Sequence, residues 1–543
     1  MSDESFSRRA FVAASAFLAA TKLEIPATLW TTGKGQRATL NAPLDDLTIG
    51  DLQAGLTSGK YTARSLVEQY LSRIDSLDKK GLVLNHVLET NPDALTIADQ
   101  RDSERQSGKA VLGPLHGIPI LIKDNIDTAD RMHTSAGSLA LATSIPPRDS
   151  WVAERLRAAG AVILGKTNLS EWANIRSTHS SSGWSGRGGQ GKNPYALDRN
   201  TSGSSSGSGG AVAASYCAAA IGSETDGSVT SPSAACGLVG IKPTVGLVGR
   251  SGIIPISHSQ DTAGPMARTV RDAALVLGAL TGVDPRDDAT KPSAGKSFTD
   301  YTHFLDPNGL RGARLGVARE GFMGYSPKTD KLVEEAIDVL KHGGATIVDP
   351  ANLPSIAKIG DAELEVLLYE LKADMNAYLA SLGPNAPQKT LADLIRFNDE
   401  HAGEEMPYFG QELFLQAEKK GPLTDVKYKA ARAKCLRLAR TEGIDAVMSK
   451  YKLDALIAPT QGPVWLIDLV NGDGGGGGSF TQPAAVAGYP HITVPMGLVQ
   501  GLPVGLSFAG RAWSEPTLLK LAYGYEQASK ARRPPTFAST ALA

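Results

Sequence analysis

The order of hydrophobic and polar positions predicts helices that alternate with short buried strands from about residue 45 onward. The hydroxyl of Thr62 can cap a helix whose apolar residues recur at helical spacing, namely Leu66, Val67, Tyr70, Leu71 and Ile74. In the same way Ser150 can cap a helix that runs to Ala159. Both segments are expected to bury one apolar face against a shared core.

Continuous apolar runs between such helices predict strands that are buried on both faces. The run GIPILI covers residues 117–122, and similar runs occupy 161–164, 456–458, 492–494 and 504–508. Buried strands interleaved with helices predict an α/β layered fold. Since no shift in composition divides the chain, a single large domain is expected.

The N-terminal residues follow a different pattern. Arg8 and Arg9 precede an apolar run at 10–20, which is too short to span a bilayer and fits the apolar region of a twin-arginine export signal. An amphipathic or unstructured tail is the alternative, because two acidic residues dilute the basic region and no clear cleavage site follows. We therefore expect an export signal at 1–30, a folded domain at 40–535, and a periplasmic or secreted protein, with a cytoplasmic one as the alternative. Stable membrane insertion is not expected, because no other uncharged apolar run reaches membrane-spanning length.

Charge and composition narrow the class of partner. The 55 Lys and Arg residues nearly balance the 56 Asp and Glu residues, without blocks of one sign, so nucleic-acid binding is not expected. Three distant cysteines without CxxC spacing predict buried thiols rather than disulfides or a zinc site: Cys217, Cys236 and Cys435. The nine histidines show no HExxH spacing, so a histidine-bound metal is not expected either. A small or neutral partner fits best.

One segment matches the sequence pattern of a nucleotide-binding motif but not its expected structural context. Residues 160–167, GAVILGKT, satisfy the GxxxxGK[ST] pattern of a phosphate-binding loop. In such a loop the four central residues curl round phosphates, whereas here they form an apolar, strand-like run. We expect Gly160 to end the preceding helix and Gly165 to follow the strand, so ATP binding is not predicted.

Two segments rich in serine and glycine carry the candidate chemistry. The first, TSGSSSGSGGAV at 201–212, resembles a flexible linker by composition. A small-residue, helix-compatible segment at 211–220 follows, and then IGSETDGSVTSP at 221–232. The Asp226-Gly227 dipeptide suits a tight turn, which can point successive backbone N–H groups at one place. That arrangement is what an oxyanion hole requires, and a linker would not explain it.

A serine nucleophile needs a base. His179 and His258 are the nearest histidines in sequence, and we interpret both as polar loop residues or substrate contacts. Lys123 ends the apolar run at 117–122 and would sit at the tip of a buried strand, where burial lowers the pKa of an amine toward neutrality. The alternative is that Lys123 simply pairs with Asp124.

These blocks resemble the amidase signature family. The resemblance rests on GPLHGIPILIKDNIDT (113–128), GAVILGKTNLSEWA (160–173), the two serine-glycine segments and a long block at 236–277. It continues through FTQPAAVAGYPHITVPMG and GLPVGLSFAGR, and so covers about residues 45–530. It implies the amidase signature fold, a large mixed β-sheet with helices on both faces, and a cofactor-free reaction. We expect a monomer that acts on a small-molecule or peptide amide.

The resemblance also implies a Ser-Ser-Lys triad. Matching the blocks puts the nucleophile at Ser228, the base at Lys123, and the relay serine, in a cis peptide, at Ser204, with Ser205 as the alternative if the match shifts by one. The oxyanion would be held by backbone N–H groups of four consecutive residues: Thr225, Asp226, Gly227 and Ser228.

Two departures bear on the substrate. Asp226-Gly227 replaces the family's common Gly-Gly, and Thr230 replaces an arginine that, in the amidotransferase branch, helps to handle a charged amino acid. Three segments look most similar to bacterial peptide amidases: SETDGSVTSP, SGIIPISHSQDTAGPM and GLSFAGRAWSE. We therefore expect ammonia release from peptide C-terminal carboxamides through an acyl-enzyme. The alternatives are aryl or fatty acyl amides, the ammonia-delivering component of an amidotransferase, and an inactive binding protein. Apolar residues at 363–382 either line the substrate groove or pack in the core.

Overall fold

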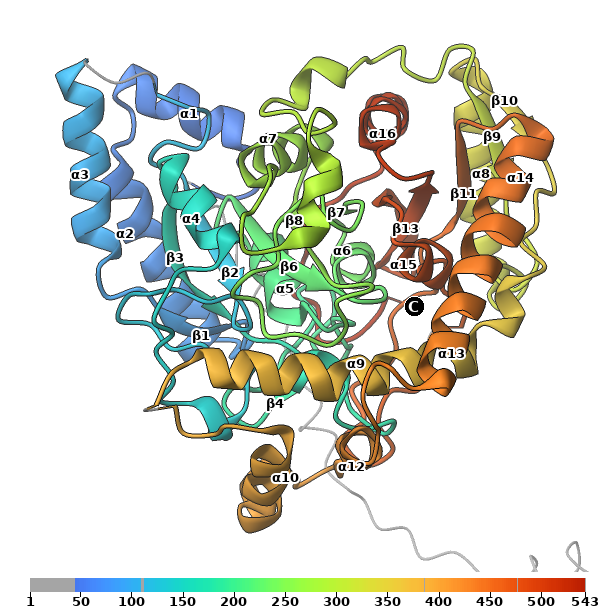
Figure 1. Cartoon of the computed structure of the whole chain (residues 1–543). Helices are drawn as coiled ribbons and strands as arrows, with labels where there is room; N and C mark the ends of the chain where they lie inside the picture. Colours follow the sequence, from blue (N-terminus) through green and yellow to red (C-terminus); the bar gives the residue numbers. More distant parts are fainter. Residues whose placement is uncertain (1–43, 109–111, 385, 476, 543) are drawn as a thin grey trace, which may run out of the picture. The chain divides into compact units, whose positions relative to one another are not determined.

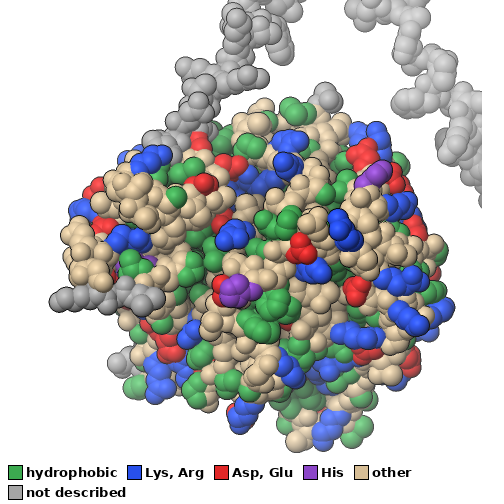
Figure 2. All heavy atoms as spheres, turned by 90° about the horizontal axis from the view of Figure 1, so that it is seen from above, with side chains coloured by type: hydrophobic (Ala, Val, Ile, Leu, Met, Phe, Trp, Pro, Cys, Tyr) green, Lys and Arg blue, Asp and Glu red, His purple; other side chains and the backbone are tan. Residues whose placement is uncertain are grey.

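A computed structural model describes residues 44–108, 112–384, 386–475 and 477–542. Within these ranges, the residues from 46 onward form one compact unit. The expected export signal at 1–30 lies outside the described residues. None of the helices in the described ranges is both long and apolar enough to cross a membrane. On the face seen in Figure 2, Lys and Arg side chains are interspersed with Asp and Glu side chains.

A mixed sheet of 11 strands runs through the unit, in the order β1-β3-β2-β6-β8-β7-β12-β13-β11-β9-β10 (Figure 1). The strands are β1 (Val87–Thr90), β2 (Pro119–Lys123), β3 (Val162–Thr167), β6 (Ala219–Glu224), β7 (Val239–Lys242), β8 (Thr262–Ala267), β9 (Arg314–Val317), β10 (Thr346–Val348), β11 (Ala455–Pro459), β12 (His491–Val499) and β13 (Leu502–Ala509). A separate hairpin joins β4 (Trp184–Ser185) to β5 (Gly189–Gln190). Parallel neighbours occur in two places, β3-β2-β6 and β11-β9-β10, with antiparallel strands between them.

Sixteen α-helices are assigned in the described ranges. They are α1 (Ile49–Ser58), α2 (Ala63–Arg73), α3 (Ala94–Ser107), α4 (Trp151–Ala158), α5 (Ser206–Ala213), α6 (Thr230–Ala235), α7 (Val270–Leu280), α8 (Pro327–His342), α9 (Gly360–Ser381), α10 (Leu391–Glu400), α11 (Ala402–Glu405), α12 (Glu412–Glu418), α13 (Val426–Leu436), α14 (Asp445–Tyr451), α15 (Gln482–Ala487) and α16 (Glu515–Ser529). Short 3₁₀ and π turns link several of them. Helix α9 is long and crosses in front of the sheet (Figure 1).

Helices cover both faces of the sheet, and β13 shows how. A Cβ at Gly505 would lie 2.9 Å from the Cβ of Ala234 on α6. The ring of Phe508, three residues along the same strand, packs against Tyr525 on α16. Because alternate residues of a strand point to opposite faces, α6 and α16 lie on opposite sides of the sheet. The predicted α/β fold with a mixed sheet between helices is confirmed.

The predicted elements are present with two corrections. Thr62 caps α2 and Ser150 caps α4, each accepting a hydrogen bond from a backbone N–H three residues on. Gly165 does not follow a strand but lies within β3, which pairs with β2 as far as Thr167. The segment 211–220 is not one helix: α5 ends at Ala213, and residues from 219 onward join the sheet because they pair with β2 and β8.

Candidate active site

Three segments meet at one edge of the sheet. Strands β2 and β6 run parallel, so their carboxyl ends lie at the same edge. Lys123 is the last residue of β2, and the turn at 225–229 follows β6. Between these strands and the turn lies the N-terminal end of α5, which continues the first serine-glycine segment. The topology thus brings together residues about one hundred positions apart in the sequence.

Lys123 is completely buried and faces hydroxyl groups. Its Nζ donates to Ser204 Oγ at 2.7 Å, to Ser223 Oγ at 2.9 Å and to the Ser223 carbonyl at 3.2 Å. Asp124 turns to other partners: it forms an ion pair with Arg187 and accepts hydrogen bonds from the Ser135 hydroxyl and the Gly137 N–H. The amine is therefore directed at Ser204 and Ser223, not at Asp124.

Burial brings the titration of this amine close to neutral pH. Loss of solvation lowers the pKa of Lys123 to about 7, although the nearby charges of Asp261 and Glu224 act in the opposite direction. A large fraction of Lys123 is therefore unprotonated at neutral pH. Only the neutral amine has a lone pair with which to accept a proton, so the geometry and the protonation state agree.

The three consecutive serines have different partners. Ser204 follows a cis peptide bond with Gly203, and its hydroxyl accepts the hydrogen bond from Lys123. Ser205 instead donates its hydroxyl hydrogen to the Ser223 carbonyl and accepts from the Ser223 N–H. The Ser206 hydroxyl donates to the Ser202 carbonyl at 2.7 Å. Only the first of the three hydroxyls is in contact with the amine.

Close approach at this point depends on a glycine in β6. A Cβ at Gly222 would lie 2.6 Å from Ser205 Oγ, closer than two such atoms can stand. The absence of a side chain at Gly222 lets the start of α5 lie directly against β6. This contact sets the distance between the first serine-glycine segment and the second.

Ser228 lies in the turn that connects β6 to α6. Gly227 has φ +79°, a backbone conformation that favours glycine. The carbonyl of Ser228 accepts a hydrogen bond from the Ser205 N–H at 3.1 Å, which ties the turn to the first segment. Ser228 is 8% exposed, whereas Lys123 and Ser204 are 0% exposed. Ser228 is therefore the member of the group nearest to solvent.

The turn offers free hydrogen-bond donors. Among the described residues, no acceptor is found for the backbone N–H groups of Asp226, Gly227 and Ser228. The Ser228 hydroxyl likewise has no hydrogen-bond partner in the described part of the chain. A side-chain hydrogen bond thus joins Lys123 to Ser204. Ser228 is held beside them by the hydrogen bond from the Ser205 backbone N–H to its carbonyl.

Two residues near the site were not predicted from the sequence. Ser223 contacts Lys123 and also accepts from the Asn125 side chain at 2.9 Å. Asp261 accepts from the Thr225 hydroxyl at 2.6 Å and so holds the start of the turn. Ser223 belongs to the SETDGS block, which was a usable signal. Asp261 lies within the block SGIIPISHSQDTAGPM, which the resemblance covers but to which no site residue was assigned.

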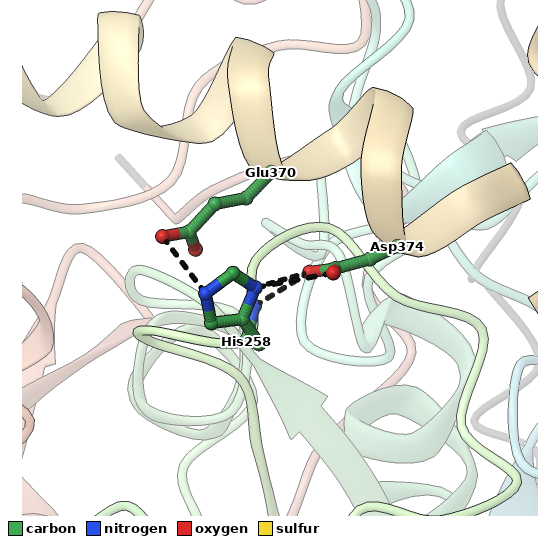
Figure 3. A group of neighbouring side chains, drawn as sticks. All are labelled: His258, Glu370 and Asp374. Carbon is green, nitrogen blue, oxygen red and sulfur yellow. Dashed lines mark hydrogen bonds and ion pairs between the residues drawn. The ribbon is translucent and has the colours of Figure 1, made fainter. Parts of the chain in front are cut away.

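His258 connects the loop that contains it to helix α9. Figure 3 shows its ring between two carboxylates of α9, with Nδ1 2.8 Å from Asp374 and Nε2 3.3 Å from Glu370. The buried Glu370 also accepts from the hydroxyls of Ser257, Ser259 and Tyr428. The side chains of His258, Glu370 and Asp374 are the group in the described ranges whose possible ligand atoms lie close enough together for a metal ion, within 4.8 Å. Their atoms are already engaged with one another and with hydroxyls, so they fasten the loop 257–261 to α9.

The remaining candidates lie away from the chemistry. Lys166 of the GxxxxGKT sequence is buried inside β3, where its Nζ donates to the Ile126 carbonyl at 2.6 Å and to the Thr134 hydroxyl at 2.7 Å. His179 lies at an exposed position beside Thr178. Most apolar residues of α9 belong to a buried cluster, which includes Leu368, Leu371, Met375 and Tyr378, whereas Leu364 is 38% exposed.

Comparison with known proteins identifies the class. The family model described as Amidase matches residues 65–519. A probable amidase of Arabidopsis thaliana is 41% identical over 91% of this chain and 92% of its own length. The native peptide amidase of Stenotrophomonas maltophilia has a structure with a TM-score of 0.87 and 51% identity, covering 91% of this chain and 99% of that one. A glutamyl-tRNA(Gln) amidotransferase component of Moorella thermoacetica is 34% identical over 90% of this chain and 97% of its own length.

The chain belongs to the amidase family. It is an amide hydrolase with the amidase signature fold, and it is similar in sequence and structure to a peptide amidase. The expected family and fold are therefore confirmed. The relative among the amidotransferases shows that the family also contains proteins with another role.

Proposed function

We propose that Ser228, Ser204 and Lys123 form the triad that hydrolyses the amide. The observation that carries this proposal is the 2.7 Å hydrogen bond from the Nζ of fully buried Lys123 to Ser204 Oγ. The pKa of about 7 at Lys123 supports the role of base. Because Ser205 bonds to the carbonyl of Ser223, it is the weaker candidate for the relay.

The reaction follows from these contacts. Neutral Lys123 accepts the proton of the Ser204 hydroxyl, and Ser204 accepts that of Ser228 as Ser228 Oγ bonds to the amide carbonyl carbon. The N–H groups at 225–228 hold the negative oxygen of the tetrahedral intermediate. The C–N bond then breaks, and the proton returns through Ser204 to the departing nitrogen, which leaves as ammonia. Water attacks the acyl-enzyme by the same route and yields the carboxylic acid.

The substrate we propose is the C-terminal carboxamide of a peptide. Similarity to the peptide amidase of Stenotrophomonas maltophilia supports this choice. Thr230 stands where the amidotransferase branch carries an arginine, which disfavours a charged amino-acid substrate. Aryl or fatty acyl amides are the second choice. Ammonia delivery within an amidotransferase is the third, supported by the relative from Moorella thermoacetica.

The test is ammonia release from a panel of amides with matched serine variants. The panel contains a peptide carboxamide, a fatty amide, an aryl amide and glutamine. We expect the peptide carboxamide to react fastest, and Ser228→Ala and Ser204→Ala to lose activity while Ser205→Ala keeps a substantial share. Hydrolysis of glutamine alone would contradict the substrate proposal. Full activity of Ser228→Ala would contradict the triad.

We further propose that residues 1–30 act as a twin-arginine export signal and that a monomer carries the activity in the periplasm or outside the cell. N-terminal sequencing of protein recovered from cell fractions of an expressing bacterium tests the first point. An uncleaved protein that stays in the cytoplasm would contradict it. Light scattering in solution tests the second.

A further inference from the structure

Helix α9 presents three acidic side chains to the loop 257–261. Glu363, Glu370 and Asp374 follow one another at helical spacing, so they lie on one face of the helix. Glu370 and Asp374 hold the first half of the loop through its serine hydroxyls and its histidine ring (Figure 3). Glu363 holds the second half, because its Oε1 accepts a hydrogen bond from Gln260 Nε2 at 2.9 Å. The loop is therefore attached to α9 along its length.

The same loop holds the start of the turn that carries Ser228. The Thr225 hydroxyl donates to Asp261 Oδ1 at 2.6 Å, and the Thr225 carbonyl accepts from Gln260 Nε2 at 3.3 Å. The other oxygen of Asp261 accepts from the backbone N–H groups of Ile256 and Ser257, each at 2.9 Å, which closes the loop on itself. Thr225 is thus fixed through both its side chain and its main chain by two adjacent residues of the loop.

A second element, the start of α15, lies against the turn at Gly227. A Cβ at Gly227 would stand 3.1 Å from Thr481 Oγ1 and 3.2 Å from Thr481 Cγ2, so the Thr481 side chain is a direct neighbour of the turn. The next residue, Gln482, donates through its Nε2 to Glu363 Oε2 at 2.7 Å. Glu363 is therefore bonded both to the loop that fixes Thr225 and to the helix that flanks Gly227.

A carboxylate is suited to this double contact. Glu363 is 6% exposed, and each of its two oxygens accepts a hydrogen bond from a side-chain amide. A glutamine in its place would offer one acceptor oxygen and one donor nitrogen, so it could accept from only one of the two amides as they stand. Gln260 is 1% exposed and cannot reverse its amide without turning Oε1 toward the Thr225 carbonyl. Gln482, which is less buried, has no such restriction.

We propose that Glu363 is a positioning residue for the turn at 225–228: by fixing Gln260 and Gln482 together, it keeps the backbone N–H groups of the turn directed at one point. Such donors stabilise an oxyanion best when they need not reorganise as charge develops on the substrate oxygen. Glu363 acts on the reaction through the turn and does not contact the substrate. The inference deepens the proposed amide hydrolysis and rests on it.

The first test measures kcat and KM for an N-acetylated dipeptide carboxamide, per folded molecule. Glu363→Ala should lower kcat about 10- to 100-fold and leave KM within about twofold, because the donors of the turn act mainly on the transition state. Glu363→Gln should recover most of the rate, since it can accept from Gln260 while Gln482 reverses its amide. The matched control is Glu365→Ala on the same helix, whose carboxylate pairs with lysines instead and whose loss should leave kcat unchanged.

A double variant tests the connection itself. Gln260→Leu should also lower kcat, and Gln260→Leu combined with Glu363→Ala should be no slower than the slower of the two single variants, because both changes break one chain of contacts. Losses that multiply would overturn the proposal. So would an unchanged kcat in Glu363→Ala, a rise in KM alone, or a Glu363→Gln variant no faster than Glu363→Ala.

A second measurement does not depend on activity. Hydrogen–deuterium exchange of the backbone N–H groups at 225–228, followed in peptide fragments by mass spectrometry, should be about tenfold faster or more in Glu363→Ala than in wild type, and unchanged in Glu365→Ala. Unchanged exchange in Glu363→Ala would overturn the proposal even if kcat falls. If exchange increases as expected but the wild-type protein hydrolyses no amide, the proposed function fails while the positioning of the turn stands, so the two failures are distinguishable.

Discussion

Two fully buried lysines lie on neighbouring parallel strands of this enzyme and behave differently. Lys123 ends β2, and Lys166 lies in β3, where it is paired with Ile122. Burial lowers the pKa of both amines. Lys166, however, has the carboxylates of Asp124 and Asp127 nearby and donates to the Ile126 carbonyl and the Thr134 hydroxyl, whereas Lys123 donates to Ser204 and Ser223. Burial and contact with a hydroxyl are thus common to both amines. The proposed base differs in that its hydroxyl partner, Ser204, lies next to the residue whose backbone N–H bonds to the Ser228 carbonyl.

The strongest way to break this comparison is to remove each amine in turn. In the proposed triad, Lys123→Ala should lower kcat on the order of 10⁴-fold, because the proton of the Ser204 hydroxyl then has no acceptor and Ser204 cannot take that of Ser228. Its fold should persist, since burial lowers the pKa of the removed amine to about 7, so that about half of the molecules carry no charge there at neutral pH. Ammonia release and a thermal melt check both points. Retention of a near-normal rate would return Lys123 to a structural role.

The matched change at the other lysine should affect stability first. Burial raises the pKa values of Asp124 and Asp127, and Lys166→Met removes a cation that opposes this rise. The variant should therefore lose about 3 kcal/mol of unfolding free energy. The fraction that remains folded should still hydrolyse amide. Urea unfolding gives the free energy, and activity per folded molecule gives the comparison. Loss of turnover without loss of stability would contradict the assigned difference.

The pH dependence sharpens the comparison further. In the proposed triad the active form of Lys123 is the neutral amine, so kcat/KM should rise as pH increases through about 7 and fall about tenfold per pH unit well below that. Substitution of Lys166 should not shift the pH at which kcat/KM rises, because this amine does not contact Ser204 or Ser228. The profile of Lys166→Met, if the variant is folded, is the control.

The smallest expected effect concerns the ion pair between His258 and Asp374 of α9. Burial acts to lower the pKa of His258, but Asp374 outweighs it and the pKa is raised, so the folded protein binds this proton more tightly than the unfolded chain does. The resulting stabilisation is present at acid pH, below the ordinary pKa of histidine, and is lost as pH rises through the raised pKa. Asp374→Asn should therefore cost a few tenths of a kcal/mol near pH 6 and almost nothing near pH 9, because His258 is 43% exposed and solvent screens the pair. Urea unfolding at the two pH values measures the difference.

Much of the fold was accessible from the sequence because its signals are local. The run at 117–122 predicted β2 with Lys123 at its end, and Thr62 and Ser150 predicted two helix starts that are present. The helix expected at 211–220 failed because tertiary pairing decided it: small apolar residues suit a helix or a buried strand, and two strands were available as partners. Gly165 was misplaced for a similar reason, since β3 continues as long as β2 does.

The candidate site was accessible in a different way. The resemblance to the family implied Lys123, Ser204 and Ser228, and spacing alone did not choose among the consecutive serines. Ser223 could have been found within its block. The contact of Glu363 with Gln260 could not, because it joins residues more than one hundred positions apart, and only the folded chain brings α9 to the loop 257–261.

Ser228 is slightly exposed whereas Ser204 and Lys123 are fully buried, and this difference bears on the path of proton transfer. Lys123 lies behind Ser204, and its other contacts are with Ser223, whose hydroxyl meets the Asn125 amide. In the proposed mechanism Ser204 is the contact of Lys123 that leads to the nucleophile, so a proton taken up by Lys123 returns by the serine through which it arrived. Ammonia then leaves with the proton that the nucleophile gave up, and each half of the proposed cycle balances its own protons.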